Sequence, residues 1–441
     1  MKRTIISVAL CLAALCGLLL IPGCRNSGSP GSAPASPGQE GTAGSTLATK
    51  DGATGTTEAG DVSSTTSGSS DAPPDGSDTP DSSSGSTVTT LPPLTPGKET
   101  SGLASVNVKD FGAKGDGKAD DTAAVQAAID QVFDEGGGYV YLPAGTYRLA
   151  AVNIKKDVCL YSDRTWNPDD PASKGETVLV PRDGSVSCVV DMSGVDGNKN
   201  SVLMNVCIDG QNLGKTVAGV ACPGLSGVSG NSMRVEDVRI LNCTGVGLDA
   251  TNNAIASVRG CMITGCGTGL KLVGWDLFIY NNMIAGNKGD GVTVSGGSAM
   301  SFHNNRIGWN DGCGVRFDGF QRVSMTGNTL DSNACPGVYF SGTANVALHG
   351  NLFIRNGWSP SSGLQNGGCQ ISVNASSGIN ITANTVQAAD DTLTGVKAPE
   401  YGIIGDILTN CVIQGNTLTG GGTKGALKTE EATNLDCVIE L

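Results

Sequence analysis

An asparagine recurs at nearly fixed intervals along the C-terminal half of this 441-residue chain. Successive members lie 23, 23, 23, 33 and 32 residues apart: Asn282, Asn305, Asn328, Asn351, Asn384 and Asn416. Extended backward, the same column contains Cys261, Val238 and Val206. A repeat of about 20–50 residues is typical of solenoid proteins, in which each unit buries its apolar side only by stacking on its neighbours.

Two apolar columns flank this position in every repeat. Three residues before it stand Leu203, Val235, Val258, Ile279, Phe302, Met325, Leu348, Ile381 and Ile413. Two residues after it stand Ile208, Ile240, Ile263, Ile284, Ile307, Leu330, Phe353, Val386 and Leu418. The residue that follows the first column is mostly polar, so the strand alternates with period two. The pattern predicts a parallel β-solenoid in which the asparagines stack at a tight turn and their amides bond along the stack.

A second polar column consists of Asn287, Asn310, Asn333 and Asn356, and Cys243 and Cys266 occupy the same position in earlier repeats. Neighbouring coils place these two thiols about 4.8 Å apart. The pair is either a stack of free thiols or a disulfide. The chain has no CxxC motif and no Cys/His metal spacing, which argues against a zinc site.

The first 24 residues predict export. Lys2 and Arg3 precede an uncharged apolar run over residues 4–20, which is short for a membrane-spanning helix. The following Ile-Pro-Gly-Cys resembles a bacterial lipobox, which implies lipidation at Cys24. An ordinary secretory signal or a single membrane anchor is the alternative. The lipobox predicts a lipoprotein of the bacterial cell envelope, anchored outside the cytoplasm in the outer membrane or at the cell surface.

Residues 25–104 consist mainly of Gly, Ser, Thr, Pro and Ala with scattered acidic residues. Such a segment cannot bury enough apolar surface to fold, so we expect a disordered linker. A flexible coil of this length reaches roughly 50 Å, which suits a tether. The net charge of −13 and the lack of a basic patch exclude nucleic acid as a partner.

The start of the remaining part, residues 105–441, carries a family signature. From Asn107 the chain has the sequence NVKDFGAKGDGKADDTAAVQAAID, and from Gly136 it has GGGYVYLPAGTY. This segment resembles the N-terminal signature of the pectate-lyase-like superfamily, especially its rhamnogalacturonase- and epimerase-like domains. The later coils resemble the parallel β-helix repeats of that superfamily. The resemblance implies an all-β, right-handed parallel β-helix that acts on polysaccharide or binds it.

The signature also predicts a capping α-helix at the N-terminal end of the β-helix. Asp120 or Asp121 is a suitable N-cap residue. One apolar stripe follows, formed by Val125, Ala128, Ile129, Val132 and Phe133. A helix here would cover the open end of the core. A calcium site built from Asp116, Asp120 and Asp121 is the alternative, although their spacing is not that of an EF-hand.

The resemblance implies a substrate cleft on the strand that opens each coil. Its outward residues are Asp249, Lys271, Thr293, Arg316, Tyr339 and Ser372. We take Lys271, Arg316, Asp318 and Tyr339 as candidate catalytic residues. Candidate substrate-binding residues are Asp249 and Asp290, with Trp275 and Asp276 in an adjoining loop. Trp275 and Tyr339 are the aromatic side chains that we expect to be exposed to a sugar.

These residues allow more than one chemistry. A glycosidase needs two carboxyl groups about 5–9.5 Å apart. Asp249 and Asp318 lie three coils apart, roughly 14 Å, so Asp318 would need Asp276 or Asp290 as its partner. Elimination on a uronate instead needs a base near C5 and a cation beside the carboxylate. Lys271 or Arg316 could be that base if its pKa were lowered, or Tyr339 could transfer the proton; Asp318 would bind calcium or pair with Arg316.

Two functions therefore remain open. The first is a monomeric, surface-anchored lyase, hydrolase or epimerase that acts on an extracellular polysaccharide, including one that contains uronate. The second is a non-catalytic β-helix adhesin or glycan-binding lipoprotein. The partners predicted are a polysaccharide and, through the lipid anchor, a membrane, with calcium as the one candidate cofactor.

Overall fold

The computed structural model describes residues 102–163, 173–193, 200–222, 231–360, 363–388, 390, 395–420, 422–430 and 434–440. The predicted signal with Cys24, and nearly all of the predicted linker, lie outside the described residues. None of the helices within these ranges has the length and apolar character needed to cross a membrane.

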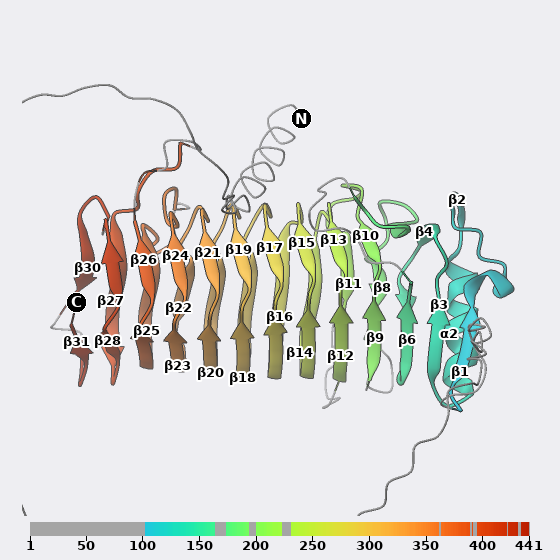
Figure 1. The fold of residues 1–441 in the computed structure, drawn as a ribbon, viewed down its shortest axis with the longest axis horizontal. Coiled ribbons are helices and arrows are strands. Elements are labelled where there is room, and N and C mark those ends of the chain that lie inside the picture. The colour runs from blue at the N-terminus through green and yellow to red at the C-terminus, as the bar shows by residue number, and fades with distance from the viewer. Residues whose placement is uncertain are drawn as a thin grey trace, which may run out of the picture. The chain divides into compact units, whose positions relative to one another are not determined.

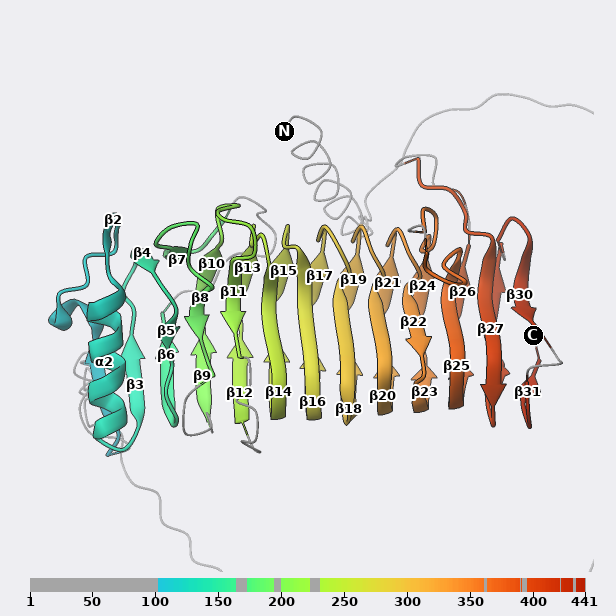
Figure 2. The same cartoon turned by 180° about the vertical axis from the view of Figure 1, so that it is seen from behind.

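The described strands form two parallel sheets that wind around one core, as Figures 1 and 2 show. The larger sheet contains β1 (Ala104–Asn107), β3 (Gly138–Tyr141), β5 (Val152–Asn153), β6 (Val158–Tyr161), β8 (Cys188–Asp191), β9 (Ser201–Met204), β11 (Ala218–Ala221), β12 (Asn231–Glu236), β14 (Val246–Arg259), β16 (Thr268–Tyr280), β18 (Val292–His303), β20 (Val315–Thr326), β22 (Val338–Ser341), β23 (Ala344–His349), β25 (Cys369–Thr382), β27 (Tyr401–Thr409), β28 (Val412–Gln414), β30 (Gly425–Thr429) and β31 (Val438–Ile439). The smaller sheet contains β2 (Asp116–Asp120), β4 (Gly145–Leu149), β7 (Thr177–Pro181), β10 (Cys207–Asp209), β13 (Arg239–Leu241), β15 (Met262–Thr264), β17 (Met283–Ala285), β19 (Arg306–Gly308), β21 (Thr329–Asp331), β24 (Leu352–Ile354), β26 (Thr385–Gln387) and β29 (Thr417–Thr419).

Each central coil consists of one long strand, a tight turn and one short strand. The long strands β16, β18 and β20 bend near their middle, where Asp276, Ala299 and Arg322 have positive φ angles of 53°, 68° and 57°. We call the parts before and after this bend the first half and the second half of the long strand. The pieces β22 and β23 play these two roles in the next coil, because β20 pairs with both.

The predicted core columns are confirmed residue by residue. Val258, Ile279 and Phe302 are register partners on successive coils, as are Ile263, Ile284 and Ile307 on the smaller sheet. Of the eighteen apolar positions, only Leu418 near the C-terminal end is partly exposed. The period-two alternation therefore places one column in the core and sends the next column outward on every coil.

The predicted asparagine stack is also confirmed. Asn282 donates its backbone N–H and its side-chain amide to Oδ1 of Asn305, and both distances are 3.0 Å. Asn305 repeats these two bonds to Asn328, and the pattern continues to Asn416. The second amide hydrogen of each asparagine is donated to a backbone carbonyl; that of Asn305, for example, is donated to the carbonyl of Ile279. The buried asparagines therefore satisfy their polar atoms without water.

The second ladder extends further than the sequence indicated. Asn287, Asn310, Asn333 and Asn356 bond in the same manner, and Gln370 then takes the next place, where its Oε1 accepts from the Asn356 amide at 2.6 Å. At the other end, the Cys266 N–H donates to Asn287. Cys243 and Cys266 are buried free thiols in this structure. Contact with Cys266, together with burial, raises the pKa of Cys243 well above its usual value.

The predicted capping helix is α2 (Thr122–Asp134), which follows the one-turn 3-10 helix η1 (Val108–Phe111). It lies at the N-terminal end of the stacked coils (Figure 2). The apolar stripe of the helix faces the core. Its side chains are fully buried at Val125, Ala128, Ile129 and Val132, and partly buried at Phe133.

Of the two predicted capping residues, Asp120 accepts the backbone N–H of Thr122, the first residue of the helix, at 3.0 Å, whereas Asp121 differs from the prediction. Asp121 occupies the N-cap position, but its carboxylate makes no capping bond and instead accepts the backbone N–H groups of Lys114 and Gly115. Asp116 accepts those of Lys118 and Ala119. These carboxylates therefore organise the loop that leads into α2. Across the described residues, no group of three or more His, Cys, Asp or Glu side chains is arranged to hold a metal.

Candidate functional site

Arg316 and Asp318 form an ion pair on the first half of β20. They are two residues apart, so both side chains point outward from the same side of the strand. Arg316 Nε lies 2.9 Å from Asp318 Oδ2, and both side chains remain partly exposed. Burial disfavours the charged guanidinium, but Asp318 and Asp290 outweigh it, and the pKa of Arg316 is raised. The hypothesis that Arg316 is a base with a lowered pKa is therefore wrong.

Tyr339 is the register partner of Arg316 on the next coil. The guanidinium carbon of Arg316 lies 5.7 Å from the centre of the Tyr339 ring, within the range of a cation–π contact. Tyr339 is only 6% exposed, so the prediction of an exposed aromatic is wrong at this position. Cys313, Cys335 and Leu364 pack around it, and Leu364 belongs to the loop between β24 and β25. Burial raises the pKa of Tyr339.

Asp290 adds a second carboxyl group to this cluster. It lies one coil before Arg316, partly buried, and its Oδ1 accepts the backbone N–H of Cys313 at 2.7 Å. Burial raises the pKa of Asp290 above its usual value, and the negative charge of Asp318 acts in the same direction. The hydrogen bond from Cys313 and the charge of Arg316 oppose this shift without cancelling it. We call Asp290, Arg316, Asp318 and Tyr339 the Arg316 cluster.

Lys271 and Asp249 form a separate ion pair on the same face. Their side chains meet at 3.1 Å from adjacent coils. Thr293 lies between Lys271 and Arg316 in register, so the two cations are two coils, or roughly 10 Å, apart. The structure thus divides the predicted first-half residues into two groups along the β-helix axis.

Trp275 and Asp276 lie at the bend of β16 and not in an adjoining loop, as the sequence had suggested. The long strand continues through them, because its register with β18 resumes after one irregularity. Trp275 is 53% exposed, as predicted. Asp276 lines a shallow groove on the second-half side, away from the Arg316 cluster.

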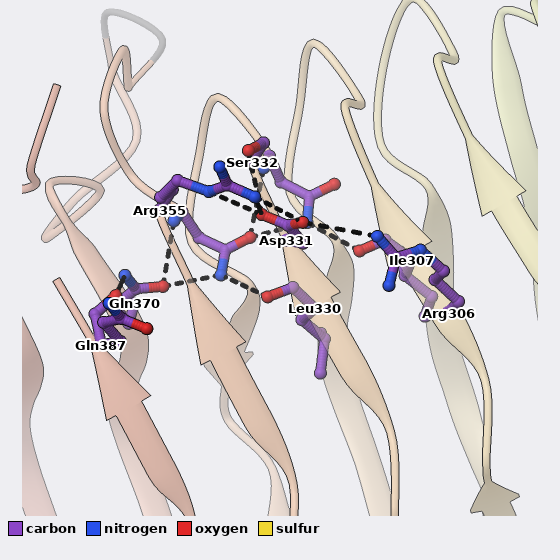
Figure 3. Close-up of polar contacts among 10 residues, drawn as sticks. Arg306, Ile307, Leu330, Asp331, Ser332, Arg355, Gln370 and Gln387 are labelled. Carbon is purple, nitrogen blue, oxygen red and sulfur yellow. Dashed lines mark hydrogen bonds and ion pairs between the residues drawn. The ribbon is translucent and has the colours of Figure 1, made fainter. Parts of the chain in front are cut away.

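A buried charge cluster on the smaller sheet was not predicted. Asp331 is 2% exposed, and both of its oxygens lie 2.8 Å from Nη2 of Arg355 (Figure 3). Arg306 lies 3.5 Å away on the preceding coil and also contacts the ring of Trp309. Both arginines pair with the carboxylate of Asp331, so this cluster joins three coils. The repeat pattern did not indicate this cluster, because the position of Asp331 is occupied by Gly308 and Ile354 in the neighbouring coils and is therefore not a polar column.

Comparison with known proteins agrees with the fold and with the signature segment. Residues 105–318 match the family model of rhamnogalacturonase A/epimerase, pectate lyase-like. Mannuronan C5-epimerase AlgE4 of Azotobacter vinelandii is 37% identical over 158 residues, which are 34% of this chain and 28% of the epimerase. Alginate lyase 7 of the same organism is 49% identical over 86 residues, 18% of this chain and 9% of the lyase. The chain therefore spans less than a third of either relative.

Solved structures show the same architecture. DFA-IIIase from Arthrobacter chlorophenolicus A6 superposes with a TM-score of 0.55 at 17% identity, covering 76% of this chain and 94% of that enzyme. Tailspike protein 2 of Escherichia coli O157:H7 bacteriophage CAB120 has a TM-score of 0.55 at 14% identity, with coverage of 73% and 46%. The described domain is a right-handed parallel β-helix with an N-terminal capping helix, as predicted. The family match and the fold together support the pectate-lyase-like superfamily.

Proposed function

We propose that this protein is a carbohydrate-active enzyme that removes the C5 proton of uronate sugars in a polysaccharide, and so cleaves the chain by elimination. The observation that carries the proposal is the Arg316 cluster, in which a partly exposed guanidinium stands between two carboxyl groups in unlike surroundings. The similarity to a C5-epimerase and to an alginate lyase supports the substrate class. Epimerisation at C5 and β-elimination both begin with loss of the same proton.

Arg316 has the chemistry to activate that proton. The C5–H bond of a uronate becomes acidic only when the negative charge on the neighbouring carboxylate is neutralised. A guanidinium binds a carboxylate through two parallel N–H donors, which a lysine cannot reproduce. Tyr339 is a positioning residue in this scheme, because its buried ring holds the guanidinium from the next coil.

The two carboxyl groups then divide the proton transfers. Asp318 is the more exposed partner, and it takes the C5 proton once the substrate carboxylate has replaced it at Arg316. Electrons from the C5–H bond form the C4–C5 double bond, and the C4–O4 bond breaks. Asp290, whose pKa burial raises, donates a proton to the leaving O4. Two carboxyls held in different environments are a common arrangement for acid and base roles.

Lys271 extends this site along the axis. Its position two coils from Arg316 suits a second uronate carboxylate on the same chain, and Asp249 holds the ammonium in place until the substrate binds. Substrate binding would therefore exchange two ion pairs within the protein for two with the polysaccharide.

The proposal includes the site of action. Lys2, Arg3 and the apolar run over residues 4–20 support export, and Cys24 supports a lipid anchor on the bacterial envelope. A tethered monomer at that place would meet extracellular polysaccharide. Labelling with a radioactive fatty acid, compared between the parent and Cys24→Ala, tests the anchor; equal labelling would contradict it.

Activity is tested on the full chain with polymannuronate, polyguluronate, polygalacturonate and a neutral glucan. The expected product is an unsaturated uronate, followed by its ultraviolet absorbance, together with deuterium uptake at C5 from heavy water. Arg316→Ala should abolish both signals, and Arg259→Ala, which removes an exposed arginine elsewhere, should not. The absence of both signals from all three polyuronates would contradict the proposal.

A second candidate function is glycan binding without turnover. The observation that favours it is that Lys271 and Arg316 are both already paired with acids, while Tyr339 is covered. This candidate predicts affinity for a polysaccharide with no product, and affinity that survives Asp290→Asn.

A further inference from the structure

A shallow groove crosses five coils on the second-half side of the β-helix and has a volume of about 540 Å³. One of its walls is a row of bend residues with positive φ angles: Asp276, Ala299, Arg322, Asn345 and Gly378. The residues just before them are register partners on successive strands. The groove therefore runs along the axis for four strand spacings, about 19 Å, and repeats every 4.8 Å or so.

A second row of lining residues runs parallel to the first. It consists of Phe278, Ser301, Ser324 and Ala347, which are register partners on successive coils, and a buried floor that includes Met300 and Val323 lies between the rows. Aromatic side chains stand at one end of the row. Phe278 is 37% exposed within the groove, and Trp275 lies on the adjoining part of β16.

Arg322 places a positive charge near the middle of the groove. Its Nη2 donates to the Ser298 hydroxyl at 2.9 Å, which holds the side chain in place, and no ion pair involves it within the described ranges. Asp276 lies two coils away in the same row. The groove thus has a cationic centre, an anionic end, and hydroxyl and amide groups between apolar surfaces.

We propose that this groove binds an extended acidic polysaccharide along the β-helix axis, at a site separate from the Arg316 cluster. The inference rests on the proposed function for the class of ligand, a polyuronate. An extended chain of pyranose rings advances by a distance similar to one coil per sugar, so successive rings meet equivalent positions. The apolar face of a sugar packs on the Phe278 ring, and its hydroxyls bond to serine and asparagine side chains.

The two charges fix the position of the chain in the groove. The guanidinium of Arg322 binds a uronate carboxylate through its planar donors. Asp276 repels a carboxylate and accepts hydrogen bonds from sugar hydroxyls. Arg322 is six residues after Arg316 on β20, at most about 20 Å along the strand, so a polymer held here stays close to the Arg316 cluster.

The test measures polyuronate binding by the full chain in an Arg316→Ala background, where turnover cannot obscure it. Adding Arg322→Ala should weaken the affinity for polymannuronate or polygalacturonate about tenfold, the loss expected for one charge-assisted contact. Ser324→Trp, which fills the groove without changing charge, should weaken it at least as much. Arg259→Ala is the matched control, since it removes an exposed arginine at the end of β14 that pairs with Glu236 outside the groove.

The outcomes separate the two proposals. Unchanged affinity in both groove variants, with thermal unfolding like that of the parent, overturns the groove inference, as does an equal loss in Arg259→Ala. The proposed function is judged independently with Arg316 intact, from product release. If groove variants lose affinity while no polyuronate is converted, the groove inference holds and the enzymatic proposal fails.

Discussion

Asn282 gives two hydrogen bonds to a single oxygen of Asn305, one from its backbone and one from its side chain. Both residues are almost fully buried, so neither side chain can form a hydrogen bond with water instead. The same oxygen thus holds the turn of one coil to the turn of the next. The ladder couples neighbouring coils through polar groups in a core that is otherwise apolar.

Replacing Asn305 with Ala should lower the free energy of unfolding by about 3 kcal/mol. The change leaves two buried donors of Asn282 without an acceptor, and each such loss costs about 1–3 kcal/mol. Asn380→Ala is the control, because Asn380 is exposed on β25 and should change stability by less than about 0.5 kcal/mol. Urea unfolding followed by circular dichroism measures both. Equal effects of the two substitutions would show that the ladder adds no stability.

The coil register could be predicted because one side-chain type recurs at one position in an apolar frame. The burial of Val258, Ile279 and Phe302 could be predicted without knowledge of the loops, because these side chains are buried only when neighbouring coils stack on one another. Gln370 was not predicted because it stands at the start of β25, only 14 residues after Asn356, and not at the turn position that the other members of the ladder occupy. The members of an asparagine ladder can thus be predicted from the sequence only where successive turns have the same length.

The candidate site was harder to predict, because its properties depend on loops and on contacts between coils. The alternation correctly placed Arg316 and Asp318 on one side of β20, and their pairing follows from that. It could not show that Leu364 covers Tyr339. It also could not show the bend at Asp276, where a positive φ angle in a non-glycine residue leaves no pattern in the sequence.

Arg316→Lys should separate charge from geometry in the proposed reaction. Lysine keeps the positive charge but loses the paired donors and the contact with the Tyr339 ring. We expect kcat/KM on a polyuronate to fall by about 10²–10³, as when one preorganised donor is lost, with Arg316→Ala lower still. Initial rates of unsaturated product formation measure this. Full activity in the lysine variant would assign Arg316 a purely electrostatic or structural role.

Asp290 predicts a pH dependence with a defined sign. Its pKa is raised in the folded chain because burial penalises the charged carboxylate. Its contribution to stability is therefore fully present below the unfolded pKa, near 3.8, and is lost as the pH rises through the folded value. Proton donation to a leaving group fails over the same upper range. Asp290→Asn should remove this step from the plot of melting temperature against pH, and the elimination rate should fall at every pH.

The control for this prediction is Asp311→Asn. Partial desolvation of its carboxyl group also raises the pKa of Asp311, although the residue as a whole lies at the surface of a neighbouring turn, and Asp311 has no place in the proposed reaction. It should alter the stability profile and leave the rate profile unchanged. A rate profile that responds to both variants would indicate that turn stability, and not a proton held on Asp290, limits the reaction.

The stacked cysteines predict a pattern of chemical protection. Cys243 and Cys266 are buried, and the raised pKa of Cys243 keeps it protonated at neutral pH, so its thiol should react slowly with iodoacetamide. Cys437 is only partly buried near the C-terminal end of the described residues and should react within minutes. Peptide mapping by mass spectrometry, before and after unfolding in urea, measures both. A peptide pair linked through Cys243 and Cys266 in the non-reduced protein would contradict the free-thiol arrangement, and rapid labelling of both in the folded chain would contradict their burial.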